Sequence, residues 1–292
     1  MIELRACETE ADLERWLEVR RAVLPGERTA TLEQQRSYTK PGDLYLLAFL
    51  DGELAGNGLC NRSDTGGAFL PPRVLPEKRR RRVGTALLHR LAAYAVEHGF
   101  ERGTAHVNGA DDGSAAFARR FGFEETRRDV QQVLTVARRT PRDVAGLTFV
   151  AVASRPELVE QAYSLAQEGY EDIPIEGIDI GLDSWLAEEA TLPDGSFVAL
   201  DADDIVGYAG LCEWPGDSRK AEHGLTVVRH DWRGRGVAAA LKERQIAWAA
   251  ANGIRELVTW TQTGNENMQA VNTRLGYELR ESSIAFGRAL PL

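Results

Sequence analysis

The sequence predicts two tandem α/β domains in which the same elements recur in the same order. The chain has 292 residues, a length that suits two domains better than one. A basic loop followed by an Ala/Leu-rich run occurs twice, as KRRRRVGTAL and as WRGRGVAAAL. An interval of 154 residues separates Arg79 from Arg233 and also Gly122 from Gly276. Because the interval is kept without net insertion, we interpret the chain as an internal duplication.

The first copy opens with a strand-like run, IELRAC, and a helix whose apolar residues follow a helical period. Two β-rich runs then meet at Asp51-Gly52, which is a hairpin signal. A further strand leads into the basic loop and a helix over 83–98, which we expect to end at Gly99.

The second copy repeats this order. It opens with LTFVAV and PELVEQAYSLAQEG, and its hairpin turns through Asp203 and Asp204. The helix after the glycine loop covers 236–252 and ends at Gly253, before the strand ELVTW. Copy two has a longer segment, residues 171–195, between its first helix and its hairpin, and extra length near a site often shapes substrate choice.

The stretch RTPRDVAG carries proline and glycine between the copies and predicts a linker over 139–146. We therefore expect an N-terminal domain over 1–138 and a C-terminal domain over 147–292.

Composition narrows the function classes. The formal net charge of -9 argues against nucleic acid as a partner, because phosphate binding needs a basic face. The three cysteines are widely spaced and form neither a disulfide framework nor a metal-site pattern. No apolar run is long enough to span a bilayer, and the acidic N-terminus does not resemble a signal peptide. We expect a cytoplasmic enzyme without a metal.

The loop WRGRGVA stands between a strand and a helix, an arrangement that points backbone N–H groups at an anion. Glycines let the backbone approach such a ligand, and Arg233 and Arg235 can add charge-assisted contacts. The pattern is neither a P-loop nor a dinucleotide fingerprint. The alternative is a solvated basic turn that caps the helix.

The two copies resemble the GNAT acetyltransferase superfamily. Its signature [Q/R]-x-x-G-x-[G/A] matches residues 233–238, and TWTQTGNENMQAVNTRLGY at 259–277 is similar to a late motif of the family. Thr261 departs from that late motif, where the first Asn would stand. The resemblance covers most of the chain twice, as in tandem proteins of the mycothiol synthase type. It implies two GNAT domains, each a central mixed, mostly antiparallel sheet flanked by helices.

The resemblance also implies acetyl transfer from acetyl-CoA to a primary amine, with the active site in the C-terminal domain. The loop amides would hold the CoA pyrophosphate at the helix N-terminus, and one strand amide would polarise the thioester carbonyl. Asn265 and Asn272 would contact the CoA arm, unless they only cap helices and join loops. The implied cofactor-binding residues are Val227, Val228, Arg233, Gly234, Arg235, Gly236, Val237, Ala238, Ala239, Asn265 and Asn272.

A substrate ammonium must lose a proton before it attacks a thioester. Many family members use a Glu eleven positions before the loop's first Arg, which is Glu222 here. Strand alternation predicts Glu222 on the same face as Gly224, Thr226 and Val228, with His223 facing the other way. The alternative is that Glu222 is a solvated strand residue. Glu213 and His223 are secondary candidates for the base.

The general acid of the family is a Tyr four residues before the late Gly, but Asn272 and Ala118 occupy those positions here. Tyr208 and Tyr277 are possible substitutes, or the thiolate leaves without an acid.

Copy one has lost several of these features. Arg82 replaces the Gly of the loop, Ala68 replaces the Glu, and Asp111 and Ala118 replace the two asparagines. A side chain at position 82 should obstruct the phosphate. We therefore expect a degenerate, structural N-terminal domain. The rival hypothesis is that the arginine run still binds CoA phosphates.

Two other functions stay open: a catalytically silent acyl-CoA-binding or regulatory protein, and a scaffold that binds no CoA. The sequence does not identify the amine that accepts the acetyl group, although acidic residues in the longer segment of copy two could attract an ammonium. They are Glu171, Asp172, Glu176, Asp179, Asp183, Glu188 and Glu189. We expect a small-molecule amine as substrate, no nucleic-acid or membrane partner, and a monomer, because the duplication can replace dimerisation.

Overall fold

A computed structural model describes residues 1–63, 66–171 and 180–292. The chain forms two compact units. Unit 1 comprises Met1–Arg128 together with Ser283–Leu292, and unit 2 comprises Asp129–Ser282. Each unit has a mixed sheet flanked by helices, so the predicted fold class is confirmed.

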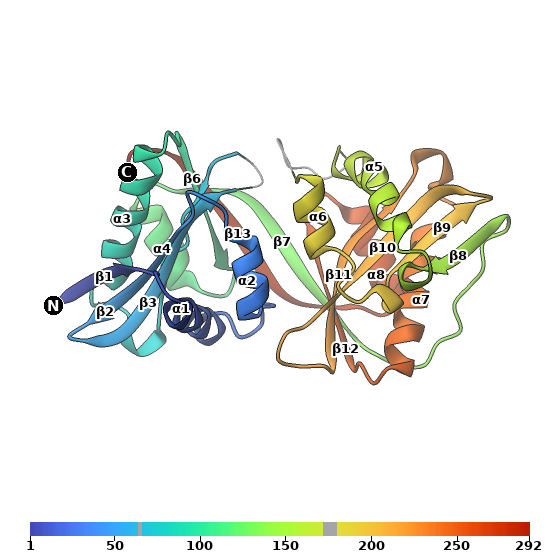
Figure 1. The fold of residues 1–292 in the computed structure, drawn as a ribbon, viewed down its shortest axis with the longest axis horizontal. Helices are drawn as coiled ribbons and strands as arrows, with labels where there is room; N and C mark the ends of the chain where they lie inside the picture. Colours follow the sequence, from blue (N-terminus) through green and yellow to red (C-terminus); the bar gives the residue numbers. More distant parts are fainter. Residues whose placement is uncertain (64–65, 172–179) are drawn as a thin grey trace. The chain divides into compact units, whose positions relative to one another are not determined.

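The sheet of unit 1 has the order β1-β2-β3-β4-β6-β13, with β5 paired to β3 (Figure 1). Helices α1 and α2 lie on one face and α3 and α4 on the other, which buries an apolar core on each side. The elements are β1 (Ile2–Ala6), α1 (Glu10–Val23), α2 (Leu32–Tyr38), β2 (Leu44–Leu50), β3 (Glu53–Arg62), β4 (Ala68–Phe69), β5 (Arg73–Val74), η1 (Pro76–Lys78), α3 (Val83–Glu97), β6 (Arg102–Asn108) and α4 (Asp112–Arg120).

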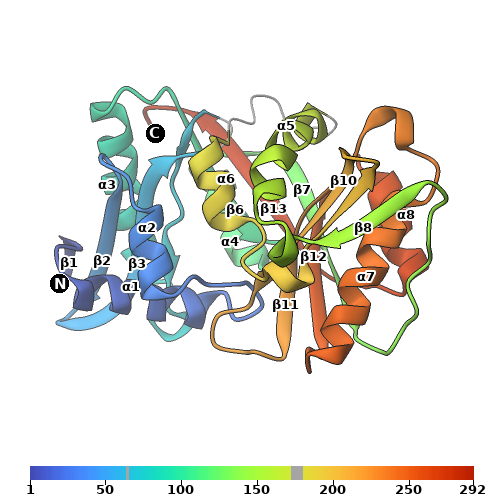
Figure 2. The same ribbon diagram turned by 45° about the vertical axis from the view of Figure 1, so that its right-hand side comes forward.

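The sheet of unit 2 has the order β7-β12-β11-β10-β9-β8. Helices α5 and α6 cover one face, and α7 covers the other (Figure 2). The elements are β7 (Glu124–Thr135), β8 (Leu147–Ala151), η2 (Val152–Ser154), α5 (Glu157–Glu171), α6 (Leu182–Glu188), η3 (Pro193–Gly195), β9 (Phe197–Asp201), β10 (Asp204–Glu213), β11 (Lys220–Val228), η4 (His230–Trp232), α7 (Val237–Ala251), β12 (Glu256–Gln262), α8 (Glu266–Leu275) and β13 (Glu278–Ala289).

The hairpins form where the turn residues predict them, with one small shift. Asp51 and Gly52 make the turn between β2 and β3, both with positive φ. In unit 2 the turn residues are Ala202 and Asp203, and Asp204 already belongs to β10. The expected turn at Asp203 and Asp204 is therefore wrong by one residue, because Ala202 takes the left-handed conformation at φ 52°.

The two copies exchange their last strands. β7 and β13 are equivalent in the repeat, since both bounds differ by 154 residues. Residues 129–135 of β7 pair with β12 in unit 2, and residues 283–289 of β13 pair with β6 in unit 1. Each sheet is thus completed by a strand from the other copy, and the compact units differ in this respect from the domains expected at 1–138 and 147–292.

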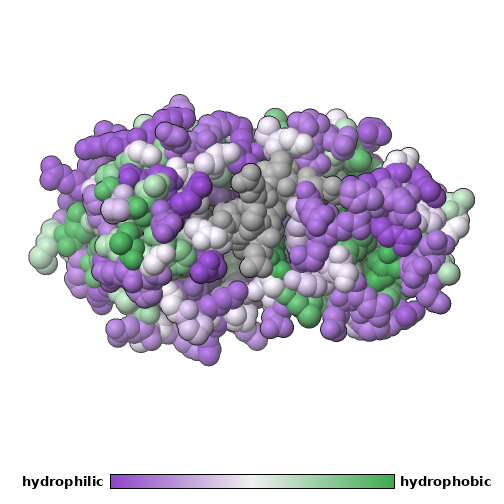
Figure 3. Space-filling view, turned by 90° about the horizontal axis from the view of Figure 1, so that it is seen from above, coloured by the Kyte–Doolittle hydropathy of each residue, from purple (hydrophilic) through white to green (hydrophobic). Residues whose placement is uncertain are grey.

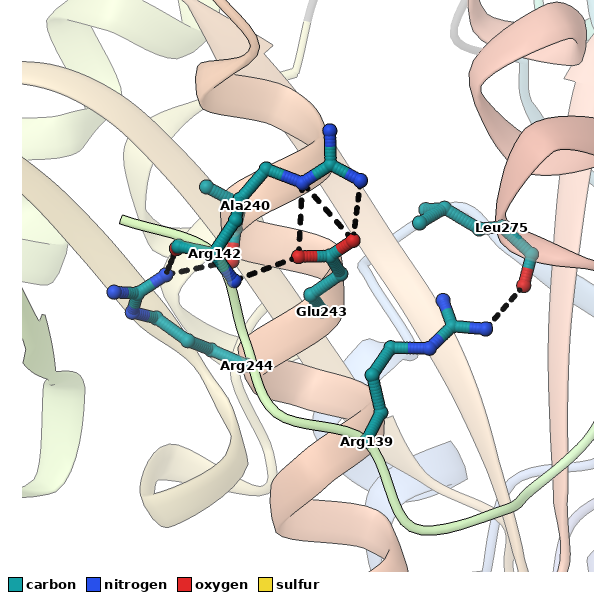
Figure 4. Close-up of polar contacts among 6 residues, drawn as sticks. All are labelled: Arg139, Arg142, Ala240, Glu243, Arg244 and Leu275. Atoms are coloured by element: carbon teal, nitrogen blue, oxygen red, sulfur yellow. Dashed lines mark hydrogen bonds and ion pairs between the residues drawn. The ribbon is translucent and has the colours of Figure 1, made fainter. Parts of the chain in front are cut away.

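The segment expected to be a linker is fastened to unit 2 (Figure 4). Residues 139–146 form neither helix nor strand. Arg142 donates to the buried carboxylate of Glu243 on α7, and Arg244 donates to Asp143 at 2.7 Å. Arg139 donates to the carbonyl of Leu275 at 2.9 Å. The segment therefore lies along α7 and reaches the end of α8.

Hydrophilic residues predominate on the face drawn in Figure 3, and the apolar residues there form small separate patches. Among the described residues no helix combines the length and apolar character needed to cross a bilayer.

The strand exchange predicts how the chain can be divided. A fragment of residues 147–292 lacks β7, so the edge of β12 loses its partner and exposes backbone groups. A fragment of residues 129–282 keeps that strand and its buried residues Val133 and Leu134. We expect the second fragment to melt cooperatively and the first to aggregate or melt many degrees lower, as followed by circular dichroism and size-exclusion chromatography. Equal stability of the two fragments would contradict this role of β7.

Candidate functional site

Helix α7 begins with a loop whose backbone is left-handed at two glycines. Gly234 has φ 74° and Gly236, the N-cap, has φ 85°. No side chain caps the helix, and the amide of Ala240 is the first to bond back, to the carbonyl of Gly236. The amides of residues 237–239 therefore precede the helical ladder. A Cβ added at either glycine would point into open space, where an anion at the helix N-terminus would lie.

The two arginines of the loop hold its shape. Arg233 donates from Nε to the carbonyl of Val228 at 2.8 Å, and its Nη2 is 3.8 Å from Glu168 of α5. The guanidinium of Arg235 lies over the ring of Trp232, 4.5 Å from its centroid. These contacts tie the loop to the end of β11 and to η4.

The sheet opens directly before this loop. β11 and β12 are parallel and pair from Lys220 to Glu222, and within the described residues the pairing goes no further. Each strand continues for several residues and stays paired on its other edge, to β10 and β7. The edges that β11 and β12 turn toward each other therefore separate into a wedge, and Val227 and Val228 lie on the β11 side of it.

A β-bulge shifts the side chains of β11. Ala209 pairs with Thr226 and Leu211 with His223, so two residues of β11, Gly224 and Leu225, face one residue of β10. Beyond the bulge, Val227 packs with the core under α5, and Val228 packs with Val237 of α7.

The bulge overturns one expectation. His223 bonds to Gln245 of α7, so Glu222 faces the α5 side. The expectation that Glu222 shares a face with Thr226 and Val228 is therefore wrong, because the extra residue reverses the alternation between them. Glu222 instead lies opposite Cys212, whose thiol bonds to the carbonyl of Glu188, the last residue of α6.

Glu189 lies over the bulge, and sequence reasoning treated it only as one surface acid among several. Both carboxylate oxygens accept from the amide of Leu225 at 3.1 Å. One oxygen is 3.5 Å from the hydroxyl of Tyr208. A Cβ at Gly210 or Gly224 would collide with this carboxylate, so the two glycines make room for it. Only spatial proximity reveals this carboxylate, since 36 residues separate it from Leu225.

The structure also places the remaining candidate acids and bases, Glu222, Glu213 and Tyr208. Glu222 is half-buried on the same face of the sheet as Glu189. Glu213 ends β10 at the far end of the strand pair, opposite Ala221. Tyr208 is fully buried beneath Glu189, and its pKa is raised by burial and by the carboxylate of Glu189.

The two asparagines have different environments. Asn265 is the N-cap of α8 and accepts from the amide of Met268. Asn272 is fully buried, and its amide nitrogen donates to Gln132 at 3.0 Å and to Thr261 at 3.4 Å. The Oδ1 atom of Asn272 and the hydroxyl of Thr226 are buried without a hydrogen-bond partner.

These two atoms lie on opposite sides of the wedge, one on β11 and the other beside β12. Buried polar atoms without a partner require an explanation, such as a bound group. The CoA arm carries two amide groups, and an anion fits the open helix N-terminus beyond it. The residues of the wedge and loop therefore fit acetyl-CoA.

Four polar side chains form a buried network under the α7 face of the bulge. Gln245 donates its amide to the carbonyls of Ala209 and Gly210, at 3.2 and 2.8 Å. Its oxygen bonds Nδ1 of His223 at 2.9 Å, and Nε2 of His223 bonds the hydroxyl of Tyr277. Lys242 lies over the ring of Tyr277, 5.5 Å from its centroid.

The donor and the acceptor of each hydrogen bond to His223 can be assigned. Because the Gln245 oxygen only accepts, Nδ1 of His223 carries the proton and Nε2 accepts from Tyr277. Burial and the charge of Lys242 hold the pKa of His223 well below its ordinary value, so the ring is neutral. His223 and Tyr277, proposed as a base and an acid, are thus buried in this chain of bonds, which fixes the carbonyls beside the bulge.

Unit 1 has an apolar residue at each equivalent position of this network. Phe69, Leu88, Leu91 and Phe123 stand 154 residues before His223, Lys242, Gln245 and Tyr277. Comparing the two copies position by position would have pointed to these positions from sequence, since each polar residue has an apolar counterpart. Leu88, Leu91 and Phe123 pack in the cores beside α3, whereas Phe69 packs on the α1 side of the sheet.

The loop of unit 1 keeps the backbone of its counterpart without the glycines. Arg80 has φ 64° and Arg82, the N-cap of α3, has φ 68°, both in the left-handed region. Arg79 donates to the carbonyl of Val74 at 3.4 Å, as Arg233 does to Val228. If Arg82 obstructs a phosphate as expected, the obstruction would come from its side chain, since the loop backbone is the same.

Three of the acidic residues proposed to attract the substrate, Asp172, Glu176 and Asp179, lie outside the described residues. In the described ranges, no group of three or more His, Cys, Asp and Glu side chains could hold a metal ion.

Comparisons with known proteins show the family of the chain. The family model described as "Acetyltransferase (GNAT) family" matches residues 9–123 and 159–277, once in each copy. A mycothiol acetyltransferase of Geodermatophilus obscurus is 29% identical over 91% of this chain and 89% of its own length. An L-methionine sulfoximine/L-methionine sulfone acetyltransferase of Pseudomonas aeruginosa is 31% identical over 37% of this chain and 67% of its own length.

Two solved structures share the fold of the whole chain. A GCN5-related N-acetyltransferase from Sphaerobacter thermophilus has a TM-score of 0.79 at 20% identity, covering 99% of this chain and 95% of its own. A tandem GNAT protein from the clavulanic acid biosynthesis pathway has a TM-score of 0.76 at 18% identity, covering 100% of both chains.

The buried network predicts a pH-dependent stability. Burial lowers the pKa of Lys242 to about 7, whereas the unfolded lysine stays protonated up to about pH 10.4. Between these values the unfolded state binds more protons, so the stability of the wild type rises with pH. Lys242→Leu, which introduces the residue of unit 1, should raise the free energy of unfolding at pH 7 by about 2–4 kcal/mol.

This gain should shrink toward pH 10, as measured by urea denaturation at both pH values. Lys220→Leu, a change at a partly exposed lysine, is the control and should show no such gain. A Lys242→Leu effect that is the same at pH 7 and pH 10 would contradict the assignment.

Proposed function

Because the chain belongs to the acetyltransferase (GNAT) family, we propose that it transfers the acetyl group of acetyl-CoA to a primary amine of a small molecule, in unit 2. The observation that carries this proposal is the open first turn of α7, preceded by the left-handed Gly234 and Gly236. When bound, acetyl-CoA supplies the activated acetyl thioester.

Different residues of unit 2 bind the pyrophosphate and the arm of acetyl-CoA. The amides of Val237, Ala238 and Ala239 receive the pyrophosphate, and Arg233 and Arg235 hold the loop in place. The wedge edge of β11 at Val227 and Val228 receives the arm, with the buried Asn272 on the other side. Asn265 contributes by starting α8.

Two carboxylates on the α5 face bind and deprotonate the amine substrate. Both oxygens of Glu189 already accept from the amide of Leu225, so this side chain is suited to hold the substrate ammonium in place. Glu222, on the same face, takes the proton from the ammonium as general base. The amine is cationic until that step, which fits the acidic character of this face.

Binding tests the cofactor site. Isothermal titration of acetyl-CoA into the full chain should give one site per chain, lost on Gly236→Arg, which places the Arg of unit 1 in the loop of unit 2. Gly253→Asn changes another positive-φ glycine just beyond the far end of α7 and should keep binding. Two sites would show that unit 1 also binds, and no binding would leave only a scaffold.

Kinetics with a panel of primary amines tests the roles of the carboxylates. Glu222→Gln should lower kcat by about 10²–10⁴ without changing acetyl-CoA affinity, because the base is lost. Glu189→Gln should mainly raise the KM of the amine, and Glu213→Gln is the control with near-normal activity. Full activity of Glu222→Gln would remove it as the base. A chain that binds acetyl-CoA but acetylates no amine would instead support the silent binding protein.

A further inference from the structure

Unit 1 contains a buried arginine where unit 2 has a valine. Arg73 of β5 stands 154 residues before Val227 and is 9% exposed. Val227 packs against α5, and Arg73 likewise faces α1, with its guanidinium 5.4 Å from the ring centroid of Trp16. A position that is apolar in one copy thus carries a buried cation in the other.

This guanidinium is not fully satisfied. Nη1 of Arg73 is buried and has no hydrogen-bond partner. Asn57, directly opposite on β3, uses its amide nitrogen on the carbonyl of Trp16 and leaves its buried oxygen unpaired. An unpaired polar group in the interior costs free energy, and a charged group costs more than a neutral one.

A second arginine adds to the charge. Arg20 of α1 lies near enough to act on the charge of Arg73, as does Glu27. Nη2 of Arg20 is 3.6 Å from Glu27, and its Nε is buried without a partner. Burial and Arg20 lower the pKa of Arg73 to about 9, so it remains protonated at neutral pH. Two cations therefore share one carboxylate.

The cluster is open on one side. The side chains of Arg20 and Glu27 are 24% and 28% exposed, while Arg73 lies deeper. Thr29, in the same loop as Glu27, has a buried hydroxyl without a partner. The Arg20–Glu27 pair is thus partly exposed, and the deeper Arg73 carries a buried donor without an acceptor.

We infer that unit 1 holds a binding site for a small-molecule oxyanion, a carboxylate or phosphate group, between Arg20 and Arg73. Two oxygens of such a group match the planar fork of a guanidinium, and the anion supplies the acceptors that Nη1 of Arg73 and Nε of Arg20 lack. The site lies on the α1 face, which corresponds to the α5 face where unit 2 places Glu189 and Glu222. The two copies therefore carry opposite charge on equivalent faces, and unit 1 selects an anion.

Titration of the full chain with inorganic phosphate, and separately with malonate, tests the site at constant ionic strength. Saturable binding is expected with at least one of the two probes. Arg73→Val, which introduces the residue of unit 2, should weaken it about tenfold or more. Arg80→Gln changes an exposed arginine of the same unit without an ion-pair partner among the described residues, and should bind as the wild type does.

The two probes distinguish a phosphorylated ligand from a carboxylate. Phosphate binding that Arg73→Val weakens, without malonate binding, identifies a phosphorylated ligand, and malonate binding that Arg73→Val weakens, without phosphate binding, identifies a carboxylate. Arg20→Gln should weaken binding as well, and it decides the matter if Arg73→Val does not fold. The variants leave unit 2 unchanged, so failure of acetyl-CoA binding there has no bearing on the result. No saturable binding by the wild type, or equal affinity in wild type, Arg73→Val and Arg20→Gln, would overturn the site.

Discussion

In unit 2, β11 and β12 separate beyond Glu222, and the binding geometry depends on that separation. β12 remains paired to β7 as far as Gln262, and β11 remains paired to β10 as far as Val228. Because the outer edges keep their hydrogen bonds, the inner edges can diverge at little cost. The divergence leaves an unpaired strand edge beside the N-terminus of α7, so backbone groups at both places are open to an extended ligand that ends in phosphates.

The bulge at Gly224 and Leu225 serves both faces of the sheet. On the α5 face it presents an amide to Glu189, and on the α7 face Gln245 holds the neighbouring carbonyls. Unit 1 has Leu88, Leu91 and Phe123 where unit 2 has Lys242, Gln245 and Tyr277, and these buried apolar side chains pack without the desolvation cost of Lys242. The polar network is thus a stability cost that only unit 2 carries. Such a cost is common where a backbone must be held in one functional shape.

Much of the fold could be predicted from the repeat, and the tandem family match confirms it. The exchange of β7 and β13 could not be predicted, because equivalent strands have similar sequences and either could complete either sheet. The glycine loop was recognisable, but the same backbone at Arg80 and Arg82 was not, since arginine rarely takes positive φ. The face of Glu222 relative to Val228 was misjudged because one bulge residue reverses the count. Glu189 stayed hidden because its partners are far away in sequence.

The exchange of end strands has a consequence for synthesis on the ribosome. The sheet of unit 1 needs residues 283–289, which are synthesised only after the whole of unit 2, although most of unit 1 is synthesised before it. Until residues 283–289 have been synthesised, β6 presents an open edge. Unit 2 has no such delay, because β7 has been made before the rest of its sheet. Unit 1 therefore begins to form before unit 2 is synthesised, and its sheet is completed only after unit 2, by residues 283–289.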